Sequence, residues 1–190
     1  MTPLETLAAW IEEARSRGMS EPEAMALATA TPAGVPSVRI VLCRGIDARG
    51  LRFFTNYESR KGIELGRNPQ AAVTFHWPVI GRQGRADGTV ERLSPAESDA
   101  YFQSRPRGHR LSAWASAQSR PLASQDELRR RMAELTAQYV GKEVPRPPHW
   151  GGFLLRPTAI ELWTQGADRI HDRVLYELRE GVWEANRLSP

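Results

Sequence analysis

Four clusters of polar residues interrupt the hydrophobic pattern of this sequence, and each carries side chains that bind anions. The first is Arg39-Ile40-Val41-Leu42-Cys43-Arg44, in which two arginines bracket four apolar residues. An arginine inside so apolar a strand is costly unless an anion pairs with it. A solvent-exposed position at the rim of a sheet is the alternative interpretation.

The second cluster, residues 55–62, runs from the end of a predicted strand into the start of a predicted helix. Helix N-termini offer free N–H groups and a positive dipole, so Ser59, Arg60 and Lys61 form a candidate phosphate cradle. A serine N-cap followed by two solvated cations is the competing interpretation.

The third cluster, residues 101–110, follows the predicted helix that begins at Ser94. Tyr101 and Arg105 are four residues apart and share one helix face, where a hydroxyl and a guanidinium can bind the same anion. The alternative is a basic helix end that the helix dipole favours.

The fourth cluster, residues 163–173, contains an aromatic residue, two arginines, a histidine and two carboxylates in one predicted strand-turn-strand corner. Balancing of surface charge is the alternative interpretation. No metal site is predicted, because the four histidines are scattered and have no cysteine partner set. Glycine-rich nucleotide loops and the G-x-S-x-G hydrolase motif are also absent.

Length and composition favour one folded domain. The chain has 190 residues, 41% of them hydrophobic and 25% charged, and no apolar run long enough to cross a bilayer. Cys43 is the single cysteine, and the first residues lack the pattern of a secretory signal. We therefore expect a cytoplasmic protein that does not contact a membrane.

The net charge of +4 is compatible with anionic ligands, and only Lys61 and Lys142 among the 26 basic residues are lysines. Arginine grips phosphate or carboxylate bidentately. Codon bias in a GC-rich genome is the alternative explanation of the arginine excess. Because no basic-aromatic RNA motif or helix-turn-helix pattern is evident, no nucleic-acid partner is predicted.

Local signals predict helices and many short strands. Capping patterns begin helices at Thr2, Ser94 and Ser124 that end near Arg17, Ser104 and Val140, and Ser59 begins a short one to Arg67. The proline-rich segment 144–148 predicts a stiff connector. The predicted strands are 24–31, 37–44, 51–56, 71–77, 82–93, 153–164, 173–179 and 182–187. Helices inserted among so many strands indicate a mainly β protein with added helices (α+β), an antiparallel barrel.

Taken together and in order, these clusters resemble the pyridoxine/pyridoxamine 5′-phosphate oxidase family from about Ala24 to Pro190. Six motifs and a characteristic ending carry the resemblance: Arg39-Ile40-Val41-Leu42, residues 55–62, residues 101–107, Gln118-Ser119-Arg120, His149-Trp150-Gly151-Gly152, Arg169-Ile170-His171-Asp172-Arg173, and Asn186-Arg187-Leu188-Ser189-Pro190.

The resemblance implies an antiparallel FMN-binding split β-barrel in one domain, residues 1–190, that forms a homodimer with FMN at the interface. Residues 1–20 would form the N-terminal helix and residues 21–143 the barrel core with its inserted helices. Residues 144–190 would supply the C-terminal strands that complete the barrel and the active site.

The resemblance also implies the site residues. Those expected at FMN are Arg39, Ile40, Val41, Leu42, Arg44, Phe54, Thr55, Arg60, Lys61, Gln83, Gln118, Ser119, Trp163 and Arg173. Those expected at a phosphorylated pyridine substrate are Arg44, Tyr101, Arg105, His109, Arg169, Ile170 and His171. Arg169 and His171 are the catalytic candidates, which would position the ring and steer the departing proton.

The implied reaction is the oxidation of pyridoxamine or pyridoxine 5′-phosphate to pyridoxal 5′-phosphate, a step of vitamin B6 biosynthesis and salvage. A hydride passes from substrate C4′ to flavin N5, and O2 reoxidises the flavin with release of H2O2. Arg44 and His109 depart from the family pattern, which has lysine and serine there. A phenazine-type oxidase, another flavin reductase, and a non-catalytic protein that binds flavin or pyridoxal phosphate therefore stay open as alternatives.

Overall fold

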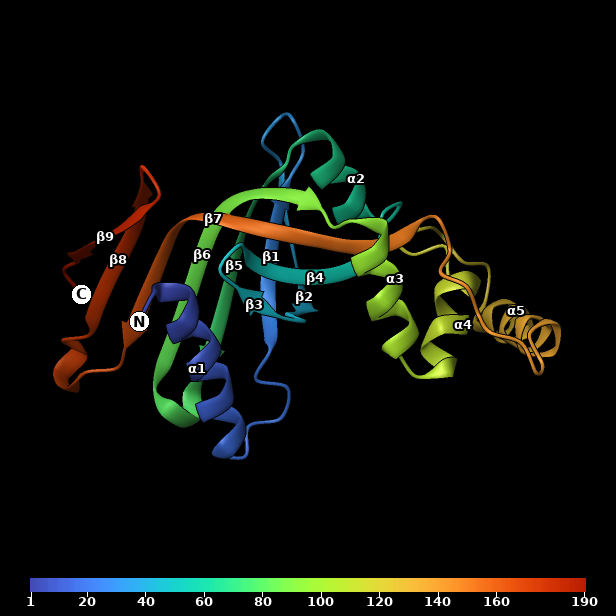
Figure 1. Cartoon of the computed structure of the whole chain (residues 1–190), viewed down its shortest axis with the longest axis horizontal. Coiled ribbons are helices and arrows are strands. Elements are labelled where there is room, and N and C mark those ends of the chain that lie inside the picture. The colour runs from blue at the N-terminus through green and yellow to red at the C-terminus, as the bar shows by residue number, and fades with distance from the viewer.

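A computed structural model describes all 190 residues, which form five α-helices, nine β-strands and two short 3-10 turns (Figure 1). The helices are α1 (Pro3–Ser16), α2 (Arg60–Arg67), α3 (Pro95–Ser104), α4 (Arg107–Ala115) and α5 (Gln125–Gln138). The strands are β1 (Ala24–Ala30), β2 (Pro36–Leu42), β3 (Ile46–Asp47), β4 (Gly50–Asn56), β5 (Gln70–Trp77), β6 (Arg82–Arg92), β7 (Trp150–Thr164), β8 (Asp172–Arg179) and β9 (Val182–Arg187). The 3-10 turns are η1 (Pro78–Ile80) and η2 (Ala167–Arg169).

The strands form one antiparallel sheet that curls on itself. Its order is β2-β1-β5-β6-β7-β4-β3, and the hairpin β8-β9 extends it from β7. Past the end of β2, the Arg44 amide donates to the Arg52 carbonyl of β4 at 2.7 Å, and the Arg52 amide donates to the Gly45 carbonyl at 2.8 Å. These bonds join the segment after β2 to β4, although β2 and β4 lie far apart in the strand order. The sheet therefore curls toward a barrel, which confirms the predicted antiparallel, barrel-like α+β fold.

Side chains that point inward from the strands fill the barrel interior. In β5 the buried residues Val73, Phe75 and Trp77 alternate with more exposed neighbours, as period-two patterning requires. Helix α1 packs its buried residues, Leu4, Leu7, Ile11 and Ala14, into the same core. Each fully buried large side chain contributes about 1.5–3 kcal/mol, so this cluster is the main source of stability.

A smaller second core joins the inserted helices to the barrel. Phe102 of α3 and Leu111 of α4 pack with Trp150 at the start of β7. In Figure 1, α3, α4 and α5 lie together at one end of the molecule, and β8 and β9 lie at the other. Strand β7 runs between the two ends: residues 150–155 pair with β4, and residues 159–164 pair with β8.

The predicted helix starts are confirmed, with one difference in chemistry. Thr2 and Ser94 form complete capping boxes with Glu5 and Glu97. At Ser124 only half of the box is present, because the Glu127 carboxylate pairs with Arg131 one turn further along the helix. No helix of the structure combines the length and the apolar character needed to span a bilayer.

Helix α3 ends at Ser104, as predicted, but helix α4 was not predicted, the end of β2 was predicted two residues too late, and the start of β7 was also predicted too late. The basic residues after Pro106 belong to a separate helix, α4, because Pro106 forces Arg105 into an extended conformation (ψ 148°) that ends α3. Strand β7 begins at Trp150, three residues before the predicted start, since Trp150 pairs with Asn56 of β4. The proline-rich connector before β7 is confirmed as neither helix nor strand.

The two glycines of α2 provide a matched stability test. A Cβ on Gly62 would lie 2.3 Å from the Tyr57 carbonyl oxygen, whereas a Cβ on Gly66 would meet nothing within 4 Å. We expect Gly62→Ala to destabilise the protein by about 1–3 kcal/mol, because helix and loop must move apart. Gly66→Ala is expected to stabilise it by about 0.5–1 kcal/mol through helix propensity.

Urea unfolding followed by circular dichroism measures both changes in the free energy of unfolding. Equal effects of the two substitutions would show that the contact between Gly62 and Tyr57 does not fix the start of α2.

Candidate functional site

A cavity of about 560 Å³, named here the cradle cavity, lies at the start of α2. Ser59 caps that helix by accepting a hydrogen bond from the Gly62 amide at 3.3 Å, so Arg60 and Lys61 occupy its first turn. The residues that line the cavity are Ser37, Val38, Arg39, Ile40, Val41, Phe54, Thr55, Arg60, Lys61, Gln118 and Ser119. The structure thus brings together residues from the first and second sequence clusters and from the loop after α4.

Lys61 is a buried cation without a carboxylate partner. Its side chain is buried, and Nζ donates to Thr55 Oγ1 at 3.0 Å and to Ser59 Oγ at 3.3 Å. Burial, together with repulsion from Arg39, lowers the pKa of Lys61 from 10.5 to about 8. Because a buried charge is costly unless it is paired, this lysine would favour binding of an anion in the cavity.

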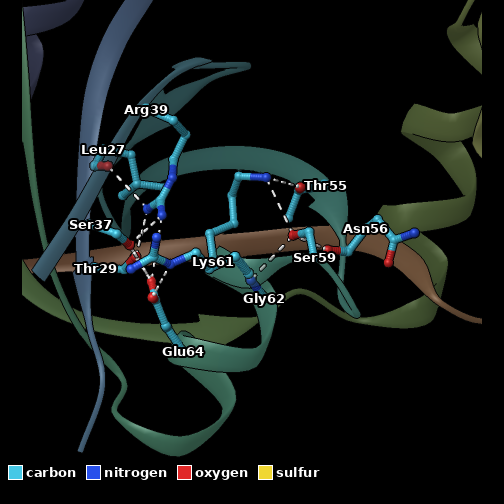
Figure 2. A network of polar contacts seen from close by, with 11 residues as sticks. Leu27, Thr29, Ser37, Arg39, Thr55, Asn56, Ser59, Lys61, Gly62 and Glu64 are labelled. Carbon is cyan, nitrogen blue, oxygen red and sulfur yellow. Dashed lines mark hydrogen bonds and ion pairs between the residues drawn. The ribbon is translucent and has the colours of Figure 1, made fainter. Parts of the chain in front are cut away.

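Glu64 is the centre of a polar network that the sequence analysis missed, together with its partners Thr29 and Ser37 (Figure 2). Its buried carboxylate accepts hydrogen bonds from the hydroxyls of Thr29 and Ser37 and from Arg60 Nε at 2.9 Å. Arg39 Nη2 lies 3.5 Å from the same carboxylate. Burial alone would raise the pKa of Glu64, but these hydrogen bonds outweigh it and lower the pKa to about 2. Glu64 is therefore ionised and joins the two arginines.

A larger cavity of about 880 Å³, named here the helical cavity, adjoins the first. Helices α3 and α4 supply much of its wall, and Phe54, Thr55 and Gln118 line both cavities. Thr55 Oγ1 donates to Gln118 Oε1 at 3.2 Å along this shared wall. A ligand that fills the cradle cavity would therefore lie beside a ligand in the helical cavity.

The helical cavity contains a second cationic group, the half-buried Arg105. Tyr101 stacks on Phe54 with ring centroids 3.8 Å apart, and the Arg105 guanidinium lies 4.6 Å from the Trp150 ring centroid. Arg105 Nη1 is buried and has no hydrogen-bond partner. Burial lowers the pKa of Arg105, which indicates an unbalanced cationic site. An anionic ligand group would satisfy this orphaned donor.

Arg44 and His109 also line the helical cavity, as does Leu42. Arg44 and Leu42 were predicted to contact FMN, but neither lines the cradle cavity, because β2 ends at Leu42 and the chain then turns toward Glu23. Arg44 Nη1 lies 3.5 Å from a Glu23 carboxylate oxygen. The structure thus groups Arg44 with Tyr101, Arg105 and His109, the predicted substrate residues.

The fourth sequence cluster lies apart from both cavities. Gln83, Trp163, Arg169, Ile170, His171 and Arg173 line neither of them. They come from the corner around η2 and β8 and from the strands paired with it, which Figure 1 shows at the end of the molecule opposite α3 and α4. Within one chain, the predicted site residues therefore form two separate groups.

The corner itself is tightly organised. The His171 ring lies 4.6 Å from the Trp163 ring, and its Nδ1 accepts a hydrogen bond from the Gly166 amide at 3.3 Å. Asp168 and Arg169 both have left-handed backbones, with φ of 52° and 64°. Consecutive residues in this strained region persist only where surrounding contacts impose them, so Arg169 and His171 are held in a defined arrangement.

The pKa of Lys61 predicts how phosphate binding depends on pH. Only the protonated amine attracts a phosphate dianion, so from pH 7, where the phosphate of free FMN is already a dianion, affinity should fall as pH rises through about 8, approaching tenfold per unit. Calorimetric titration with FMN between pH 7 and 9.5 measures this fall. Lys61→Met should bind weakly at every pH and give a flat profile, whereas a flat profile for the unaltered chain would contradict the prediction.

Family comparisons cover nearly the whole chain. Residues 11–140 match the model of the pyridoxamine 5′-phosphate oxidase family, and residues 150–190 match the pyridoxine 5′-phosphate oxidase C-terminal dimerisation region. The pyridoxine/pyridoxamine 5′-phosphate oxidase of Rubrobacter xylanophilus is 50% identical over 188 residues, which cover 99% of this chain and 87% of that protein. The oxidase of Cupriavidus taiwanensis is 51% identical, with coverage of 99% and 89%.

Two solved structures share the architecture. PhzG from Burkholderia lata, in complex with tetrahydrophenazine-1-carboxylic acid, has a TM-score of 0.94 at 36% identity and covers 99% of this chain and 92% of that one. An FMN-binding protein from Nostoc punctiforme has a TM-score of 0.78 at 20% identity, covers 100% and 99% of the two chains, and supports the fold alone. With the matches to both family models, these likenesses show that the chain belongs to the pyridoxamine 5′-phosphate oxidase family.

Proposed function

We propose that this protein is an FMN-dependent oxidase that converts pyridoxamine or pyridoxine 5′-phosphate to pyridoxal 5′-phosphate. One observation carries the proposal: two adjoining cavities each contain a cationic group that pairs with no protein carboxylate, the buried Lys61 in one and the half-buried Arg105 in the other. Two phosphorylated ligands side by side fit this arrangement. Relatives at about 50% identity bear the name of this oxidase.

The cradle cavity has the donor set that the phosphate of FMN requires. Arg39, Arg60 and Lys61 supply three cationic groups at a capped helix N-terminus. Thr55 and Gln118, on the wall shared with the helical cavity, lie where the rest of the cofactor would pass toward the substrate. When bound, FMN supplies the hydride acceptor, and O2 returns it to the oxidised form with release of H2O2.

The helical cavity is the proposed substrate site. The Arg105 guanidinium, the Tyr101 hydroxyl, and the side chains of Arg44 and His109 would bind the substrate phosphate. Because the wall is shared, a substrate anchored there would place its pyridine ring beside the cofactor. This anchoring would supply orientation rather than chemistry.

A second copy of the chain would complete the site. Arg169 and His171 lie outside both cavities of their own chain, and residues 150–190 match a dimerisation region. In a homodimer, the corner of one subunit would reach the cavities of the other, with FMN at the interface. Arg169 and His171 would then position the substrate ring and steer the proton that leaves the amine or hydroxyl group on C4′ as the hydride departs, while Gln83, Trp163 and Arg173 would contact FMN.

Oxidation of an aromatic carboxylate is a second candidate function. The structural likeness to PhzG with its bound phenazine carboxylate favours it, as do Arg44 and His109, which replace the expected lysine and serine. Turnover of unphosphorylated aromatic carboxylates, with none of pyridoxamine 5′-phosphate, would select this second function.

The proposed reaction predicts a direct spectroscopic result. Purified protein reconstituted with FMN should lose its absorbance near 450 nm when pyridoxamine 5′-phosphate is added without air, because the hydride reaches the flavin (~450 nm is the usual band of oxidised flavins). Admission of O2 should restore the absorbance and yield equal amounts of H2O2 and pyridoxal 5′-phosphate. Unchanged absorbance at saturating substrate would contradict the proposal.

Because Arg105 Nη1 has no partner within the protein, we expect that replacing Arg105 weakens substrate binding. Arg105→Met should raise KM for pyridoxamine 5′-phosphate about 100-fold with little change in kcat, since loss of a charge-assisted anchor removes about 2–3 kcal/mol of binding. The exposed Arg130, on α5, provides the control Arg130→Met, which should leave both constants unchanged. Steady-state kinetics with phosphorylated and unphosphorylated substrate tests the anchor: a similar rise in KM for both would show that Arg105 does not bind the phosphate.

A further inference from the structure

Glu64 does not line the cradle cavity, yet it contacts the arginines that do. Arg39 comes from β2 and Arg60 from α2, and the Glu64 carboxylate pairs with both, at 3.5 and 2.9 Å (Figure 2). We propose that Glu64 is a positioning residue, which holds these two guanidinium groups in the arrangement that receives the phosphate of FMN. The inference rests on the proposed function, because it requires FMN in this cavity.

The two arginines need such a link because they repel each other. Burial lowers the pKa of the Arg39 guanidinium, and repulsion from the Arg60 charge acts in the same direction. Each arginine also has a long, flexible side chain that loses rotamer freedom when it is fixed. A carboxylate between them offsets the repulsion and fixes both side chains before the ligand arrives, so the cavity is preorganised for phosphate.

The carboxylate is itself held in place from two strands. Thr29 of β1 and Ser37 of β2 donate their hydroxyl protons to Glu64, and Arg39 donates to both of these hydroxyl oxygens. Arg39 also donates to the Leu27 carbonyl at 3.3 Å. Figure 2 shows these bonds as one network between the strands and α2. The network ties the helix that carries Arg60 and Lys61 to the strand that carries Arg39.

The charges allow positioning to be distinguished from simple attraction. The cradle cavity has three cationic groups, Arg39, Arg60 and Lys61, and Glu64 compensates one of these charges, which leaves a net charge of two positive units to match a phosphate dianion of about −2. Replacement of Glu64 by glutamine adds a positive unit. If only net charge mattered, FMN would then bind more tightly, whereas positioning requires weaker binding.

The test compares FMN with riboflavin, which lacks the phosphate, on the full-length protein stripped of flavin. Quenching of flavin fluorescence gives both dissociation constants for the unaltered chain, Glu64→Gln and Glu64→Asp. We expect Glu64→Gln to weaken FMN binding at least tenfold and to change riboflavin binding less than twofold. Glu64→Asp keeps the charge with a shorter reach and should give an intermediate loss, again for FMN alone.

Glu91→Gln is the matched control, because Glu91 pairs with Arg156 at 2.7 Å and lines neither cavity. It should leave both constants unchanged.

Three results would overturn the inference about Glu64 while leaving the FMN site in place. FMN binding by Glu64→Gln that equals or exceeds that of the unaltered chain would show that net charge dominates. Equal losses for FMN and riboflavin would show a general structural role. If Glu64→Gln does not fold, unchanged FMN binding by Glu64→Asp would show that Glu64 does not position the two arginines. An unaltered chain that does not favour FMN over riboflavin would instead refute the FMN site, and the role of Glu64 with it.

Discussion

The organisation of this protein depends on cationic side chains that are buried without a full set of protein counter-charges. Lys61 donates only to hydroxyl oxygens, and Arg105 retains a buried nitrogen that donates to nothing. In a low-dielectric interior such groups are costly, and the cost falls when an anion enters. Binding of an anion in each cavity would offset this local cost.

The barrel and its insertions place these cations in adjoining cavities. Strands β2 and β4 and helix α2 build most of the cradle cavity, while α3, α4 and the start of β7 build much of the wall of the helical cavity. Strand β7 continues to the opposite end of the molecule, where it carries Trp163 and leads to His171 (Figure 1). Because one rigid strand separates the two groups of predicted site residues, a single chain cannot bring them together without a large rearrangement. A second copy provides a simpler solution.

Features with local causes could be predicted from the sequence. The caps at Thr2, Ser59 and Ser94 depend on neighbouring residues alone, and each lies where the sequence indicates. The grouping of Ser59, Arg60 and Lys61 at a helix start could also be predicted, since a strand end, a serine cap and two basic residues follow one another directly. The family resemblance added residues such as Gln118, whose position on the shared wall has no local sequence signal.

Features that depend on distant contacts could not be predicted in this way. Glu64 resembles an ordinary helix glutamate four residues after an arginine, and only the fold brings Thr29 and Ser37 to its carboxylate. Helix α4 was missed because its basic start was read as the end of α3, although Pro106 separates the two. The separation of Arg169 and His171 from Arg105 follows from the length of β7, which was predicted to begin later.

The phosphorus NMR spectrum of protein-bound FMN, followed from pH 5 to pH 8, tests the central claim most directly. A free phosphate monoester takes up its second proton near pH 6, with a pKa of about 6. If the buried cations of the cradle cavity bind the phosphate, the bound group stays a dianion, and its chemical shift does not change over this range. A bound phosphate that titrates near pH 6, as the free cofactor does, would contradict the account.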